Sequence, residues 1–111
     1  MLANIRIYQI NIDRDKLNLA FDSFEMVERL SGTTDINKSI YDLAYEGSVS
    51  AENLEEIYTI FNIQKPKDFS GRSLSVSDVV EVISSETMKK GFYFCDTFGF
   101  QKVNFEEAED A

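Results

Sequence analysis

The segment "GRSLSVSDVV", residues 71–80, decides how the rest of the sequence is interpreted. It places three serines within five positions behind Gly71. If the segment is a variant of the G-x-S-x-G turn of hydrolases, Ser73 is a candidate nucleophile. If it is not, the segment is a turn that leads into a strand. The first interpretation predicts an enzyme and the second a binding module.

The serines do not fit a nucleophile turn. That turn needs a second glycine two residues after the serine, and Ser75 stands at this position. The chain also has no histidine, so no imidazole is present to deprotonate Ser73. We therefore predict a turn that Gly71 bends, in which the short side chains of Ser77 and Asp78 accept hydrogen bonds from backbone amides.

The other reactive residues form no alternative catalytic arrangement. Cys95 has no histidine partner and lies between aromatic residues, so we expect a buried structural cysteine. The chain has neither a Cys/His cluster for zinc nor a glycine-rich phosphate loop. Carboxylates are paired at Glu55–Glu56 and Glu106–Glu107, but adjacent residues on a helix diverge, and chain ends rarely position catalysts. We predict no catalytic residue, no cofactor and no metal; an enzyme with a carboxylate-based site is the remaining enzymatic alternative.

Length and composition predict a single domain. The chain has 111 residues, of which 43% are hydrophobic, and this is enough to bury one core. The N-terminus does not resemble a signal peptide, and no apolar stretch approaches the roughly 20 residues that a membrane helix needs. A single cysteine excludes an internal disulfide, which fits a reducing cytoplasm. We expect a cytoplasmic domain over residues 1–105, followed by an acidic flexible tail at 106–111.

The periodicity of the N-terminal half indicates a strand and then a helix. "NIRIYQINI" (residues 4–12) alternates between two faces and is rich in β-branched and aromatic residues, which predicts a strand. "FDSFEMVERLSG" (residues 21–32) predicts a helix. Asp22 and Glu25 are spaced almost as in a capping box, and Gly32 is placed to end the helix.

The clearest helix lies in "SAENLEEIYTIFNIQ", residues 50–64. Apolar residues at i, i+3, i+4 and i+7 form one stripe. These residues are Leu54, Ile57, Tyr58 and Phe61. Ser50 is the expected N-cap, and the helix must end before Pro66.

Three further segments predict strands and complete the fold class. "SIYDLAYEG" (residues 39–47) alternates between two faces, and residues 79–83 are expected to form a strand that is buried on at least one face. "FYFCDTFGFQKVNF" (residues 92–105) predicts a hairpin whose loop contains Gly99. The sequence therefore predicts an α+β fold, with a small, mostly antiparallel sheet of about four to five strands packed against two main helices.

Two segments also carry a family resemblance. "IFNIQKPKDFSGRSLSVSDVVEV" (residues 60–82) and "GFYFCDTFGFQKVNF" (residues 91–105) resemble the YodL-like domain of bacterial and mobile-element proteins. The matching positions are Phe61-Asn62, Pro66, Phe69, Gly71, the pattern from Ser73 to Asp78, Asp96 and Gly99-Phe100. The N-terminal residues 7–10 and the segment "YDLAYEG" also fit, so the resemblance covers nearly the whole chain. Arg72 and Cys95 depart from it, since histidine and an apolar residue are more usual there.

The resemblance implies a small α+β module with no established general catalytic activity. Such modules are often fused to other domains on conjugative and phage-like elements. This chain ends shortly after the matching pattern, so we expect no fused effector domain.

Charge indicates the kind of partner. The chain has 20 acidic and 11 basic residues and a net charge of −9. Such a surface repels phosphate backbones, so we expect no direct binding to nucleic acid. It is suited to occupy a basic groove on another protein, although a surplus of acid can also serve solubility alone.

These observations favour a non-catalytic, acidic, protein-binding module of mobile-element type. Its most concrete version is an inhibitor of a host defence nuclease, either a CRISPR or a restriction nuclease, that occupies the nuclease's nucleic-acid groove. The alternative is an accessory interaction protein of element transfer or bacterial cell physiology. The candidate contact residues are acids of the predicted helix and tail. They are Glu52, Glu55, Glu56, Glu106 and Glu107.

Overall fold

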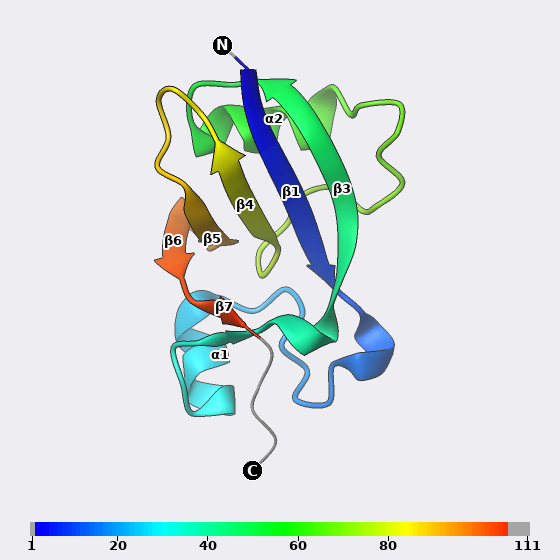
Figure 1. Ribbon diagram of the computed structural model, residues 1–111. Coiled ribbons are helices and arrows are strands. Elements are labelled where there is room, and N and C mark those ends of the chain that lie inside the picture. Colours follow the sequence, from blue (N-terminus) through cyan, green and yellow to red (C-terminus); the bar gives the residue numbers. More distant parts are fainter. Residues whose placement is uncertain (1, 107–111) are drawn as a thin grey trace.

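A five-stranded antiparallel sheet of order β3-β1-β4-β5-β6 forms the frame of the molecule (Figure 1). The computed structural model describes residues 2–106. Its helices are η1 (Ile12–Arg14), α1 (Phe24–Ser31), η2 (Lys38–Ile40) and α2 (Leu54–Ile63). Its strands are β1 (Leu2–Ile10), β2 (Ile36–Asn37), β3 (Tyr41–Ser50), β4 (Val79–Ser84), β5 (Gly91–Cys95), β6 (Phe100–Val103) and β7 (Phe105–Glu106). The predicted α+β class is confirmed.

The first strand, β1, is an interior strand of the sheet and pairs with β3 on one side and with β4 on the other. Ile5 and Ile7 are fully buried on one face, while Arg6 on the other face pairs with Glu46 and Glu81. The strand register shifts between Ile7 and Tyr8. From Ile7 to Ile10 every side chain is buried, since packed segments cover both faces there.

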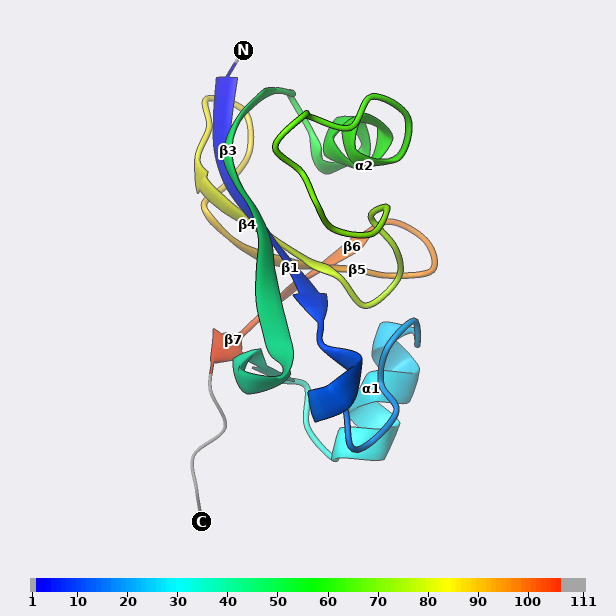
Figure 2. The same ribbon diagram turned by 90° about the vertical axis from the view of Figure 1, so that its right-hand side faces the viewer.

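Helix α2 covers one end of the sheet through a narrow apolar contact (Figure 2). Ile57 and Phe61 are fully buried. The centre of the Phe61 ring lies 4.9 Å from the centre of the Tyr45 ring and 5.0 Å from that of the Phe69 ring. Tyr58 was expected in this stripe, but it is 42% exposed. Ile60 packs against the core instead, so the helix is turned with Tyr58 toward solvent.

The helix caps also differ from the prediction. Asn53, rather than Ser50, caps α2, and its Oδ1 accepts the amide hydrogen of Glu56 at 2.8 Å. Ser50 belongs to β3, and Asn53 stands immediately before the first helical residue, where a cap can reach the free amides. Ser23, rather than Asp22, caps α1 for the same reason. The predicted end of α1 at Gly32 is confirmed, with φ of 80°.

A second core closes the other end of the sheet. Phe105 lies at the centre of this core. The centre of the Phe105 ring is 4.9 Å from the ring centre of Tyr8, 5.0 Å from that of Tyr41 and 5.2 Å from that of Phe92. The predicted hairpin over residues 92–105 is therefore shorter: β6 ends at Val103, and Phe105 begins β7. Strand β7 then pairs in parallel with β2. Neither α1 nor α2, the two α-helices of the described chain, is long and apolar enough to cross a membrane.

Removing the Phe61 side chain should destabilise the domain strongly. We expect Phe61→Ala to lower the free energy of unfolding by about 3–5 kcal/mol, because it leaves a cavity beside the rings of Tyr45 and Phe69. Ile63→Ala on the same helix is the matched control, since Ile63 is 77% exposed and should change stability by less than about 0.5 kcal/mol. Urea unfolding measures both values. Equal effects of the two substitutions would show that α2 does not pack through Phe61.

Candidate protein-binding surface

The turn before β4 is built on a buried polar contact between Gln9 and Asp78. Asp78 is fully buried, and its Oδ2 accepts hydrogen bonds from the Ser75 amide at 2.8 Å and from Gln9 Nε2 at 3.1 Å. Gln9 also pairs with the backbone of Arg72, donating to its carbonyl at 2.8 Å and accepting from its amide at 3.0 Å. A Cβ on Gly71 would lie 2.5 Å from Gln9 Oε1, so this approach requires glycine.

The predicted role of the serine segment is confirmed by these contacts. Ser77 Oγ accepts the amide hydrogen of Phe21 at 2.9 Å, and Asp78 accepts that of Ser75. The backbone of this segment also holds β5, because the Ser77 amide donates to the Cys95 carbonyl at 2.9 Å and the Cys95 amide donates to the Asp78 carbonyl at 2.8 Å. The serine pattern therefore joins β1, β4 and β5.

Cys95 is buried, as predicted. Burial raises the pKa of its thiol to about 12, with smaller contributions from the carboxylates of Asp78 and Asp96. The thiol is therefore protonated at neutral pH and is a poor nucleophile. Among residues 2–106 no group of three or more metal-ligating side chains is placed to hold a metal ion.

Three predicted contact residues lie together at the start of α2. Glu52, Glu55 and Glu56 are all exposed. Glu56 has a structural part, because its Oε1 accepts the amide hydrogen of Glu52 at 3.1 Å. Negative charge is favourable at a helix N-terminus, where the free amides and the helix dipole are positive. In the part of the chain that the structure describes, the carboxylates of Glu52 and Glu55 make no hydrogen bond or ion pair, so they are available to a partner.

Beside these glutamates a groove separates α2 from the loop between β5 and β6. Its volume is about 430 Å³. On one side it is lined by Glu55, Tyr58 and Thr59, and on the other by Val76 and residues 95–100. We call it the α2 groove.

The α2 groove is both aromatic and acidic. Phe98 at the loop tip is 91% exposed, and Tyr58 across the groove is 42% exposed. Asp96 adds a second carboxylate to that of Glu55; its Oδ1 is held by the amides of Phe24 at 3.1 Å and Thr97 at 2.8 Å. No lysine or arginine is among the residues that line the groove. Aromatic faces and carboxylates both attract cationic side chains.

The remaining predicted contact residues do not join this surface. Glu106 lies in β7 and pairs with Asn37 of β2, at the end of the molecule opposite α2 (Figure 1). Glu107 lies outside the described residues, as does the rest of the predicted tail, 107–111. The structure therefore unites the three helix glutamates and separates Glu106 from them.

Sequence reasoning missed the aromatic half of the groove. Phe98 was interpreted only as part of a turn, although its position between Thr97 and Gly99 at a hairpin tip indicates an exposed ring. Gly99 has a φ of 71°, as its place in the loop predicted. Tyr58 was missed because it was assigned to the buried stripe of α2, where Ile60 packs instead.

The domain is thus a small α+β module in which a buried turn supports an acidic, aromatic groove. The chain belongs to the YodL-like domain family, whose model matches residues 4–105. No curated protein and no solved structure gives a significant match. The resemblance inferred from the serine segment and the aromatic strand is confirmed.

The buried Asp78 should make stability fall as pH rises. Burial raises the pKa of Asp78 to about 6, against the partly opposing hydrogen bonds from Ser75 and Gln9 and the charge of Arg72. Because the folded state then holds this proton more tightly than the unfolded state does, its contribution is present below about pH 4 and is lost as pH rises through about 6.

Asp78→Asn removes the charge and keeps an oxygen acceptor. We expect its free energy of unfolding, relative to wild type, to increase by about 2–3 kcal/mol between pH 4 and pH 7, as two pKa units correspond to ~2.7 kcal/mol. Urea unfolding across this range measures the difference, and Glu86→Gln, which removes an exposed carboxylate, is the control. A pH-independent difference between Asp78→Asn and wild type would contradict the prediction.

Proposed function

We propose that the protein is a non-catalytic binding module whose α2 groove and neighbouring glutamates hold a basic segment of a protein partner. The observation that carries this proposal is the pairing of Phe98 and Tyr58 with the carboxylates of Glu55 and Asp96 in one groove. Each exposed cation–π contact contributes about 0.5–1 kcal/mol. Two aromatic rings beside the free carboxylate of Glu55 and the negative charge of Asp96 favour arginine or lysine over other side chains.

The concrete version of the proposal is inhibition of a host defence nuclease, of the CRISPR or the restriction type. Such a nuclease has a basic groove that holds nucleic acid, and a protein with a net charge of −9 is attracted to it over long range. The glutamates at the start of α2 enter the basic groove of the nuclease in place of phosphates. Phe98 and Tyr58 of the α2 groove then contact basic side chains of the nuclease. Competition with nucleic acid, rather than chemistry, is then the mode of action.

The test is displacement of target DNA. Catalytically inactive, guide-loaded CRISPR nucleases and restriction enzymes are each bound to labelled target DNA, and fluorescence anisotropy follows release as the protein is added. We expect release from at least one nuclease, with an affinity that weakens as salt rises toward about 0.3 M, because exposed charges are then screened. Retention of DNA on every nuclease tested would contradict the nuclease version.

Matched variants separate the groove from net charge. Glu52→Lys with Glu55→Lys should weaken DNA displacement by about tenfold or more, since each reversed contact costs about 1 kcal/mol. Asp13→Lys with Glu28→Lys changes the net charge equally, on exposed residues of η1 and α1 away from the groove, and should change displacement by less than about twofold.

The aromatic part is tested by Phe98→Ala, which should weaken displacement and leave urea unfolding unchanged because the ring is solvent-exposed. Equal displacement by the two double variants would remove the α2 groove from the proposal and leave a general charge effect.

A further inference from the structure

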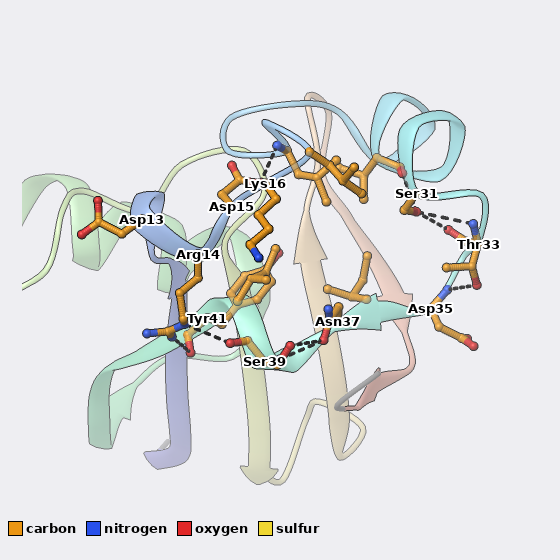
Figure 3. A pocket seen from close by; sticks show the side chains of 15 residues that line it. Asp13, Arg14, Asp15, Lys16, Ser31, Thr33, Asp35, Asn37, Ser39 and Tyr41 are labelled. Carbon is orange, nitrogen blue, oxygen red and sulfur yellow. Dashed lines mark hydrogen bonds between the residues drawn. The ribbon is translucent and has the colours of Figure 1, made fainter. Parts of the chain in front are cut away.

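A larger pocket lies at the other end of the molecule, between α1, the segment 13–19 and the segment 35–41 (Figure 3). Its volume is about 680 Å³. It reaches the second core, because Leu19, Val27 and Ile36 belong to both. We call it the α1 pocket. Small-molecule sites have this construction, in which an apolar floor is combined with a few polar groups at the rim.

The polar rim is supplied by three different segments. Ser31 and Thr33 stand at and after the end of α1, and Ser39 stands in η2. Part of the rim is already engaged: Ser31 Oγ donates to the Val27 carbonyl at 2.7 Å. The apolar floor is therefore the larger attraction for a ligand, and the rim limits how the ligand can be oriented.

Two cationic residues, Arg14 and Lys16, line the α1 pocket. Arg14 is occupied by Asp42 at 2.6 Å and by the carbonyl groups of Ser39 and Tyr41, each at 3.0 Å. Within residues 2–106, the ammonium group of Lys16 has no hydrogen bond or ion pair, and it points across the pocket toward Tyr41 (Figure 3). A ligand in the pocket would therefore meet this ammonium group.

The carboxylates of the lining do not compete for this cation. Both oxygens of Asp15 accept backbone amides, from Leu19 at 2.8 Å and from Ala20 at 2.8 Å. Asp13 and Asp35 point away from the pocket (Figure 3), and Asp35 Oδ1 accepts Asn104 Nδ2 at 3.1 Å. They still make the surroundings negative, which disfavours a ligand with two or more negative charges.

We propose that the α1 pocket binds a small organic monoanion with an apolar body, such as a medium-chain or aromatic carboxylate. The apolar body lies against Leu19, Val27 and Ile36, and the anionic group pairs with Lys16. This site is separate from the α2 groove and takes a different class of ligand. Its volume of about 680 Å³ lies in the range of about 300–1,000 Å³ that is typical of small-molecule sites.

Two fluorescent probes of similar shape test the proposal on the whole chain. 8-Anilinonaphthalene-1-sulfonate carries an apolar body and one negative charge, and N-phenyl-1-naphthylamine has almost the same body without charge. We expect both to bind the folded protein. Lys16→Met should weaken binding of the sulfonate about three- to fivefold, as for a partly exposed ion pair, and change binding of the amine by less than about twofold.

Lys65→Met is the matched control, because Lys65 is an exposed lysine in the loop after α2, and it should leave both affinities unchanged. Val27→Phe fills the pocket and should weaken the binding of both probes, with urea unfolding used to verify that the variant is folded.

A second measurement uses the wild-type chain alone: decanoate should shift the amide NMR signals of Ile36, Ile40 and Tyr41. Shifts confined to the α2 groove, no binding of the sulfonate, or equal affinities for Lys16→Met and Lys65→Met would each overturn the proposal.

Discussion

The side-chain amide of Gln9 is the contact on which the arrangement of this domain depends. Gln9 lies in β1, an interior strand of the sheet, and its side chain exchanges two hydrogen bonds with the backbone of Arg72 while also donating to the buried Asp78. A hydrogen bond of this kind contributes about 1 kcal/mol net, but a buried group left without its partner costs about 1–3 kcal/mol. An apolar residue at position 9 would therefore leave the carbonyl and amide groups of Arg72 and the carboxylate of Asp78 without these hydrogen bonds at the same time. One further atom of the network, Asp78 Oδ1, has no hydrogen-bond partner among residues 2–106.

The same turn places both candidate sites. Val76 lines the α2 groove, and the neighbouring Ser77 accepts the hydroxyl hydrogen of Tyr41 at its carbonyl, at 2.7 Å. Tyr41 in turn lines the α1 pocket. Ser77 has a positive φ of 83°, a conformation that costs a non-glycine residue about 1–2 kcal/mol. The contacts made by its amide, carbonyl and hydroxyl groups offset that cost and fix the turn between the two sites.

Local signals in the sequence predicted most elements of the fold but not their long-range partners. The period of two in β1 and the period of helix α2 arise from which side chains one element buries, so a short window of residues reveals them. The pairing of β2 with β7 joins residues 36–37 with residues 105–106, which are far apart in the sequence, and no local pattern records it. Asn53 rather than Ser50 caps α2 because β3 extends to Ser50. The end of β3 is set by its pairing with β1, which is likewise a long-range contact.

The candidate surface shows the same division. The acidic side of α2 could be predicted, because residues opposite an apolar stripe face solvent. The α2 groove could not, since it exists only where the loop bearing Phe98 stands across from Tyr58. Glu106 was placed in a tail because its neighbours are acidic, yet Phe105 draws it into β7 by packing between Tyr8 and Tyr41.

The single, protonated Cys95 gives this domain a built-in reporter of its own local opening. Its side chain is buried in β5, and its amide is bonded to the Asp78 carbonyl, so alkylation should be slow until that strand separates from the turn. The ratio of the labelling rate in the native state to that of an unprotected thiol then gives the free energy of this separation. Comparing that value with the free energy of complete unfolding would reveal whether the sheet opens at β5 as a separate cooperative unit or only with the whole molecule.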